Sequence, residues 1–334
     1  MKLLDIARNL VRNGHDGSSA RLPSMNHYCQ IDENALSSLS MRLAARAEAP
    51  ANGWLAALDD RRTEIFTSLS FTNRCFLLLV FHAIGFCYFV EPRWRYQGID
   101  GAKALLTRLC DDKDLKGFDL VLTASDLRAW LGGTGTLPLM AERAAHLREI
   151  VNGVTNSGGR EQYMHYLLIG ENPETMHAFA LAESIAAKLA CYRDSVQVTP
   201  ELAFAPLKRA QLLVSDLTRI ASVDTTSSVV RNRLAAIDLS TLTAFADYKL
   251  PQILRAYGVL QYEPVLAACV DQQIFLPTNG PEEIAIRAAT IVAVEQIAKR
   301  AHMRACDVDA ALWLESQTHV GHLAPYHRVL TTAY

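Results

Sequence analysis

The sequence lacks the features that define several large classes of protein. Lys and Arg number 33 against 35 Asp and Glu, so no excess of positive charge is available to grip a nucleic-acid backbone. The longest apolar run, residues 75–90, contains His82 and Gly85 and is too short and mixed for a membrane span. The N-terminus has no cleavable apolar segment of a secretory signal. We therefore expect a cytoplasmic protein that contacts neither a membrane nor nucleic acid directly.

Paired cysteines and recognisable cofactor motifs are also missing. The seven cysteines are odd in number and show no metal-knuckle or redox spacing, which indicates buried, reduced thiols. His319, His322 and His327 cluster near the C-terminus, but no HExxH pattern accompanies them. A dinucleotide fingerprint and a serine nucleophile elbow are absent as well. The sequence therefore predicts an absence of both metal and cofactor.

One glycine-rich stretch, Gly132-Gly133-Thr134-Gly135, allows two interpretations. Its backbone amides could cradle a phosphate, but no clear strand precedes it and the lysine of a phosphate loop is lacking. Glycine commonly ends helices, so a helix-ending turn is the favoured reading.

What the sequence contains in quantity is helical periodicity. Apolar residues recur at helical spacing through most of the chain, and caps or prolines precede several of the segments. The principal predicted helices span residues 32–48, 71–86, 101–109, 125–131, 139–151, 174–189, 202–220, 234–246, 265–270, 281–300 and 306–317. Strand candidates are few, the clearest being residues 88–96. The expected fold is therefore all-α with few short strands.

No internal repeat or low-complexity linker interrupts this pattern. A single compact domain over residues 1–334 is the favoured organisation, with residues 1–60 as a divergent N-terminal helical segment. The oligomeric state is left open by the sequence.

The stretch from Ala244 to Gln252 joins two apolar helical segments. Pro251 suits the first residue of a helix, because an amide in the first turn has no intrahelical partner. Leu250 is then expected to be extended, as residues before proline usually are. Asp247 would lie just before the helix. There it could be merely a helix cap, or it could be a functional carboxylate.

A second candidate lies at Lys208-Arg209, which opens an otherwise apolar helical segment. A cation at a helix start opposes the helix macrodipole. Lys208 is therefore either a solvated helix end or a group that points at an anion or a catalytic carboxylate. Among the aromatic residues at 86–96, most are expected in the core, while one or two, such as Phe86, could stack on a flat heterocycle.

Several short segments, taken in order, resemble the queuosine salvage proteins, the queuosine 5′-phosphate N-glycosidases. The match runs from about residue 70 to the end. Its segments are Leu127-Arg128, Leu137-Pro138-Leu139, Glu142-Arg143, Lys208-Arg209-Ala210-Gln211, residues 245–252 with Leu254 and Gly258, Glu283, Ile286-Arg287-Ala288, Leu312-Trp313 and Pro325-Tyr326-His327-Arg328. Departures from the family pattern are Ala285, Lys249, Gly85 and Phe89, and they bear on substrate contacts more than on the chemistry.

This resemblance implies an all-α fold similar to helix-hairpin-helix DNA glycosylases and the release of queuine, a 7-deazaguanine base, from its nucleotide. It also implies that Asp247 and Lys208 are the catalytic pair. Cleaving the glycosidic bond builds positive charge on the ribose, and Asp247 would stabilise that charge, attack the sugar or activate water. Lys208 would hold Asp247 ionised, or meet the departing base or the phosphate.

Further substrate contacts are expected from Tyr248, which would stack on or orient the base, and from Phe86. Arg209, His327 and Arg328 are candidates for phosphate or structural contacts. The predicted partner is a small nucleotide, queuosine 5′-phosphate. Two alternatives stay open: an N-glycosidase of another nucleoside, nucleotide or damaged base, and a non-catalytic helical binding module.

Overall fold

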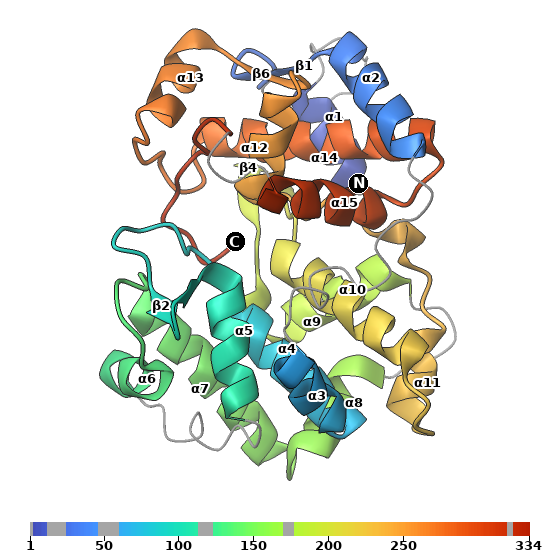
Figure 1. The fold of residues 1–334 in the computed structure, drawn as a ribbon. Coiled ribbons are helices and arrows are strands. Elements are labelled where there is room, and N and C mark those ends of the chain that lie inside the picture. The colour runs from blue at the N-terminus through green and yellow to red at the C-terminus, as the bar shows by residue number, and fades with distance from the viewer. Residues whose placement is uncertain (1–2, 12–24, 46–59, 113–122, 170–176, 319–322) are drawn as a thin grey trace. The chain divides into compact units, whose positions relative to one another are not determined.

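The computed structural model describes residues 3–11, 25–45, 60–112, 123–169, 177–318 and 323–334. Within these ranges the chain forms fifteen α-helices, and its six strands pair only as three two-stranded antiparallel sheets (Figure 1). The predicted mainly helical fold is confirmed, whereas the likeness to helix-hairpin-helix glycosylases stays a prediction. Much of the divergent N-terminal segment, with His319 and His322, lies outside the described residues.

Contacts divide the chain into two compact units, and each is treated separately below. Unit 1 consists of Met1–Gly53, Asp194–Lys208 and Leu242–Leu330, and unit 2 consists of Trp54–Arg193, Arg209–Thr241 and Thr331–Tyr334. Each unit is therefore assembled from segments that are distant in sequence. A single domain over the whole chain stays a prediction.

Unit 1 is a helical layer with two small β-ribbons. Its elements are α1 (Leu3–Val11), β1 (Cys29–Ile31), α2 (Glu33–Ala44), β4 (Val196–Thr199), β5 (Leu202–Phe204), α12 (Lys249–Ala256), β6 (Leu260–Tyr262), α13 (Pro264–Asp271), α14 (Pro281–Ala301) and α15 (Ala305–Thr318). Strand β1 pairs with β6, and β4 pairs with β5. Helix α2 begins as the sequence predicts, because the Oδ1 atom of Asp32 accepts a hydrogen bond from the Ala35 amide at 2.8 Å.

Helix α14 is the centre of unit 1. It begins at Pro281 with acidic residues in its first turn, as predicted from the preferences of helix starts. Nearly every residue from Glu283 to Ala298 is buried, which fits a helix that is apolar on all sides. Helices α1, α2, α12 and α15 pack on it, and Figure 1 shows them gathered around it.

Unit 2 is also mainly helical. Its elements are α3 (Asp60–Ser68), α4 (Phe71–Ile84), β2 (Arg95–Tyr96), β3 (Ile99–Asp100), α5 (Gly101–Asp111), α6 (Ala124–Leu131), α7 (Met140–Asn156), α8 (Arg160–Ile169), α9 (Ala178–Lys188), the 3₁₀ turn η3 (Ala190–Tyr192), α10 (Lys208–Val223, of which Lys208 belongs to unit 1), α11 (Val229–Ala235) and η4 (Leu239–Thr241). The predicted strand at residues 88–96 is reduced to β2.

Helix α4 is the buried helix predicted for residues 71–86, and α5, α7 and α8 pack against it. The Ser70 hydroxyl caps it by accepting a hydrogen bond from the Asn73 amide. Gly85 follows its last residue at a close approach, because a Cβ atom there would lie 2.6 Å from the Phe81 carbonyl oxygen. The departure from the family pattern at Gly85 thus coincides with a position that has little room for a side chain.

The glycine-rich stretch ends helix α6, as the favoured interpretation held. Gly132 is the C-cap residue, with a φ of 59°, a left-handed value that glycine adopts at little cost. A Cβ atom on Gly133 would lie 2.3 Å from the Arg95 carbonyl oxygen, so the chain passes close to β2 here. Its backbone is engaged in this contact: the amides of Arg95 and Thr134 donate to each other's carbonyl oxygens.

Two predicted helices are wrong in extent. Residues 202–207 form β5 and a loop instead of a helix, since Pro206 lacks an amide and disfavours helical geometry in the residue before it. Of the helix predicted for residues 234–246, only Leu234 and Ala235 are α-helical, as the last two residues of α11 (Val229–Ala235). Beyond it the carboxylate of Asp238 accepts a hydrogen bond from the Ser240 amide at 2.9 Å, a local turn that competes with helix formation.

The cysteines agree closely with the prediction. All seven have free thiols and all except Cys269 are buried. In the described part of the chain, no helix has the length and apolar character needed to cross a bilayer.

Candidate functional site

Asp247 lies in unit 1 at the end of an irregular segment, residues 242–248, that leads into helix α12. Its Oδ1 atom accepts hydrogen bonds from the amides of Lys249 at 2.7 Å and Leu250 at 3.0 Å. Both amides belong to the first turn of α12, where no carbonyl of the helix can reach them. Asp247 lies one residue before the N-cap residue, Tyr248, and satisfies two first-turn amides as a cap would, with only one of its two oxygens.

The start of α12 differs from the prediction. The helix begins at Lys249, so Pro251 is its third residue and Leu250 is helical instead of extended. The proline is tolerated because its missing amide lies in the first turn, where no intrahelical acceptor exists. The preference for extended geometry before proline is overridden here by the hydrogen bond from Leu250 to Asp247.

Lys208 is the first residue of helix α10, and its ammonium group approaches Asp247. The distance from the Lys208 Nζ atom to the Asp247 Oδ2 atom is 3.8 Å, within ion-pair range but longer than a direct hydrogen bond. The two side chains are 11% and 13% exposed, so most of each group is shielded while a part still reaches the surface. The ammonium group therefore approaches Oδ2, whereas the amides of α12 bond to Oδ1.

Two further residues adjoin this pair without having been given a role from the sequence. Asp194 and Arg287 form a buried ion pair in unit 1 and also bond to the main chain at Lys208 and Ala246. Arg287 stands in an otherwise apolar helical stretch, and a charge on a buried helix face is a signal that could have drawn attention to it. A lone aspartate such as Asp194 carries no comparable signal.

Two tyrosine rings pack against each other in unit 1. Tyr248 follows Asp247 in sequence, and its ring centroid is 4.7 Å from that of Tyr326 at an interplanar angle of 40°. The Lys249 ammonium lies 5.0 Å from the centre of the Tyr326 ring, which is within cation–π range. Both tyrosines are half-buried, so their rings offer an apolar surface with polar edges, and one of them, Tyr248, is the residue that follows Asp247.

His327 and Arg328 follow Tyr326 in the chain but differ in environment. His327 is buried, and burial together with the nearby charge of Arg287 lowers its pKa to about 3. Its imidazole is therefore neutral at physiological pH and supplies no charge to a phosphate. The guanidinium of Arg328 donates to the Gln273 side chain and remains part-exposed. Their predicted roles toward a phosphate stay predictions.

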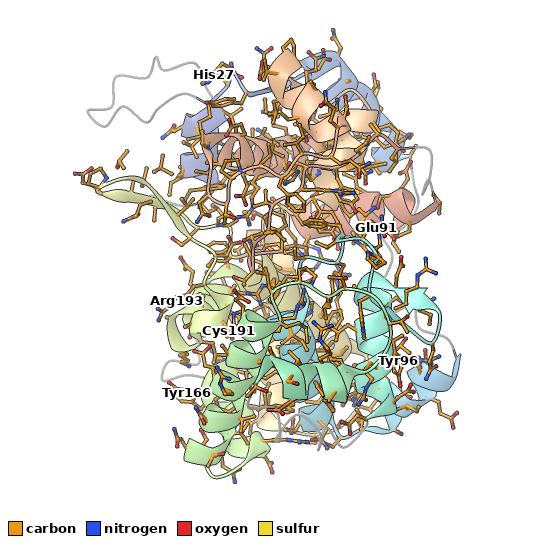
Figure 2. All side chains as sticks on the ribbon, turned by 90° about the vertical axis from the view of Figure 1, so that its left-hand side faces the viewer. His27, Glu91, Tyr96, Tyr166, Cys191 and Arg193 are labelled. Atoms are coloured by element: carbon orange, nitrogen blue, oxygen red, sulfur yellow. The ribbon has the colours of Figure 1, made fainter. Side chains whose placement is uncertain are left out.

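Arg209 and Phe86 belong to unit 2 and contact each other there. The Arg209 guanidinium donates to the carbonyl oxygens of His82 at 2.8 Å, Ala83 at 2.9 Å and Cys191, which is labelled in Figure 2. It also lies 5.2 Å from the centre of the Phe86 ring. Both residues are about 1% exposed, so their contacts among the described residues are with the protein core. Their predicted roles in binding substrate are untested.

A second arginine completes this cluster in unit 2. The Arg143 guanidinium lies 4.0 Å from the centre of the Phe86 ring and donates to the carbonyl oxygens of Ile84, Phe86 and Pro138. Burial lowers the pKa of Arg143 to about 10, so it stays cationic at neutral pH. Burial, with Arg209 as the next contributor, also lowers the pKa of His146 to about 4. The carbonyls at the end of α4 are thus satisfied by two cations.

A cavity of about 300 Å³ in unit 2 contains none of the predicted site residues. It lies between α7, α8 and the end of α9, with Glu149, Tyr163 and Lys188 in its wall. The Glu149 carboxylate accepts hydrogen bonds from the amides of Ala190 and Cys191, and the exposed Tyr166, labelled in Figure 2, also lines the cavity. The Glu149 carboxylate in the wall of this cavity thus serves the local backbone.

Metal ligation has no support among the described residues, where no group of three or more His, Cys, Asp or Glu side chains converges. His319 and His322 lie outside those residues, so the expected absence of a metal remains a prediction for the full chain.

Comparison with known sequences decides the family. The profile described as queuosine salvage protein matches residues 108–334, a span that includes both Lys208 and Asp247. The chain belongs to the queuosine salvage protein family. Phe86 precedes the matched span.

Individual relatives extend the similarity over most of the chain. The queuosine 5′-phosphate N-glycosylase/hydrolase of Sphaerobacter thermophilus is 34% identical over 323 residues, covering 91% of this chain and 92% of the relative. The protein of the same name from Dictyostelium discoideum is 26% identical over 306 residues, covering 88% of each chain. The mouse protein of that name is 30% identical over 179 residues, covering 49% of this chain and 45% of its own length.

Proposed function

We propose that this chain hydrolyses the N-glycosidic bond of queuosine 5′-phosphate and releases queuine and ribose 5-phosphate, which makes the base available for salvage into tRNA. Family membership and the names of the relatives support the substrate class. The observation that carries the chemistry is the approach of the Lys208 ammonium to one oxygen of the Asp247 carboxylate, at 3.8 Å.

The carboxylate is suited to a reaction that builds positive charge on a sugar. Two amides hold Oδ1 of Asp247, which fixes the plane of the carboxylate and the direction of Oδ2. A fixed anion stabilises a developing cation without reorganising during the reaction. Oδ2 would then stabilise the ribosyl cation, attack the anomeric carbon, or accept a proton from the attacking water.

The leaving base makes this electrostatic contribution more important. A 7-deazapurine has carbon in place of the second imidazole nitrogen, so the base cannot be protonated at that position as it departs. The barrier must then be lowered chiefly from the sugar side, by Asp247. Lys208 lies close to the carboxylate, and its ammonium group would donate to the departing base or to the phosphate.

The adjoining aromatic surface supplies a means of binding the base. Tyr248, the residue after Asp247, packs against Tyr326, and stacking on such ring faces suits any flat heterocycle. We assign Tyr248 to the base, and keep Arg328, His327, Arg209 and Phe86 as secondary candidates for substrate contacts.

Incubation of the purified chain with queuosine 5′-phosphate, followed by chromatographic detection of free queuine, tests the proposal. The wild-type chain is expected to release queuine, and Asp247→Asn is expected to bind the nucleotide but not to release the base. A panel of other nucleosides, nucleotides and damaged duplexes runs in parallel. Turnover of a panel member in place of queuosine 5′-phosphate would reassign the substrate, and no turnover of any would favour a binding module.

Lys208→Met separates the two functions open to the lysine. A loss of turnover of 10²-fold or more at saturating substrate is expected if the ammonium acts in the chemical step. A rise in KM with unchanged turnover would instead make Lys208 a phosphate anchor.

A further inference from the structure

The buried ion pair between Asp194 and Arg287 has no part in the chemistry proposed above. The Arg287 Nη1 atom donates to Asp194 Oδ1 at 2.8 Å, and Nη2 donates to Oδ2 at 2.6 Å. The side chains are 5% and 4% exposed. This is the two-pronged guanidinium–carboxylate arrangement, which fixes the relative orientation of its partners as well as their distance.

Each member of this pair also makes a hydrogen bond to the main chain at or beside one of the two proposed catalytic residues. Asp194 Oδ2 accepts a hydrogen bond from the amide of Lys208 itself, at 2.9 Å. Arg287 Nε donates to the carbonyl oxygen of Ala246 at 3.1 Å, directly before Asp247. One ion pair therefore connects the backbone that carries the ammonium to the backbone that carries the carboxylate.

Both backbone segments have a local reason to need such support. Leu207, directly before Lys208, has a φ of 50°, in the left-handed region that leucine seldom adopts. Lys208 itself places a cation at the start of α10, where the helix macrodipole favours an anion, and the Asp194 carboxylate supplies one.

On the other side, residues 242–246 belong to no helix or strand. Their backbone is held by side chains instead: Asp309 Oδ2 accepts from the Phe245 amide at 2.7 Å, and Arg287 holds Ala246. The position of Asp247 before its helix therefore depends on contacts from α14 and α15.

We propose that Asp194 and Arg287 are positioning residues that set the separation of Lys208 and Asp247 for cleavage of the glycosidic bond. The proposal rests on the proposed function. Neither residue need touch substrate, since each acts through the main chain. A displacement of the reacting groups by about 1 Å can cost about 10²-fold in rate, so a clamp of this kind has a measurable effect on turnover.

Arg287→Lys is the first test, because lysine keeps the charge but cannot span both oxygens of Asp194 and the Ala246 carbonyl. We expect kcat per folded molecule to fall about 10- to 100-fold while KM stays within about threefold. Arg255→Lys is the matched control. Arg255 makes the same two-pronged bond to Asp271, at 2.7 and 3.0 Å, within unit 1, and its kcat is expected to be unchanged.

A double-mutant cycle separates positioning from general destabilisation. Asp194→Asn is expected to lower kcat at least 10-fold in the wild-type background but no more than about twofold in the Lys208→Met background, because Asp194 acts through Lys208. A loss of folded enzyme would multiply equally in both backgrounds, and that result would overturn the proposal. Asp194→Asn also serves if Arg287→Lys fails to fold.

Hydrogen exchange keeps the two proposals distinguishable. Exchange of the Lys208 amide, measured in peptides covering residues 205–212, is expected to speed up at least 10-fold in Asp194→Asn relative to wild type. Unchanged exchange would refute the clamp whatever the activity. A wild-type chain that releases no queuine, together with faster exchange in the variant, would count against the proposed function and leave the clamp supported.

Discussion

Replacing Asp247 with asparagine and with alanine separates the charge of this side chain from its hydrogen bonds to α12. Asparagine keeps an oxygen that can accept from the Lys249 and Leu250 amides, and it caps helices about as well as aspartate. Alanine loses both bonds, which costs about 0.5–2 kcal/mol of stability at a helix start. The carboxylate charge, in contrast, is lost in both variants.

The unfolding temperature should therefore distinguish the two variants, whereas the release of queuine should not. We expect Asp247→Asn to unfold within about 0.5 °C of wild type and Asp247→Ala to unfold about 1–3 °C lower, since an unfolding entropy of about 2.1 cal/mol/K per residue makes 1 kcal/mol correspond to about 1.4 °C in a chain of 334 residues. Release of queuine should fall by at least 10³-fold in both variants, about 4 kcal/mol of transition-state stabilisation. Circular dichroism gives the first quantity and chromatography of free queuine the second.

Asp32 provides a matched control in the same unit. It caps α2 through the Ala35 amide, as Asp247 caps α12. Asp32→Asn and Asp32→Ala should reproduce the pattern of stability while leaving queuine release unchanged. The reasoning is refuted if Asp247→Asn keeps more than a tenth of wild-type activity, or if the Asp32 variants lose activity to the same degree.

Three other expectations concern His327 and Tyr248 in unit 1 and Arg209 in unit 2. The pKa of His327 is held near 3 in the folded chain against about 6.5 in the unfolded chain, so between these pH values only the unfolded state gains a proton, and stability falls as pH drops. At pH 5.0 the expected loss of stability is up to roughly 2 kcal/mol. His327→Gln should therefore reduce the difference between the urea midpoints measured at pH 7.5 and pH 5.0. Arg209→Lys should lower stability by roughly 2–4 kcal/mol, because an ammonium cannot reach three carbonyl oxygens; a selective loss of activity toward phosphorylated substrate would instead support a phosphate contact. If the Tyr248 ring stacks on the base, Tyr248→Ala should raise KM about 10-fold and Tyr248→Phe by less than twofold. A KM of Tyr248→Ala equal to that of wild type would remove Tyr248 from the site.

Those parts of the fold that depend on local chemistry were predictable from the sequence. Helices α2 and α14 begin where Asp32 and Pro281 predict, because caps and first-turn prolines act on the nearest few amides. Strand β5 falls within the helix predicted for residues 202–220, so that part of the prediction is wrong. Strand β5 pairs with β4, and the spacing of apolar residues does not reveal such a pairing. Pro206 disfavours helical geometry in the residue before it, but the apolar spacing of the residues around it favours a helix.

The candidate site was predictable only in part. The capping function of Asp247 follows from its position before α12, but its approach to Lys208 does not follow from spacing, since the two residues lie on separate segments. Resemblance to a family supplied that pairing. The link through Asp194 and Arg287 was not foreseen, because a tertiary ion pair that ends on main-chain atoms leaves no periodic pattern in the sequence.

The cluster of Arg143, Arg209 and Phe86 has a consequence for the way unit 2 opens. Helix ends ordinarily fray first, because their last carbonyls have only solvent as partners. At α4 those carbonyls are held from α7 and α10, so the terminus cannot loosen until two other helices release it. The end of this helix should accordingly be as slow to open as its middle, and the three helices should come apart together.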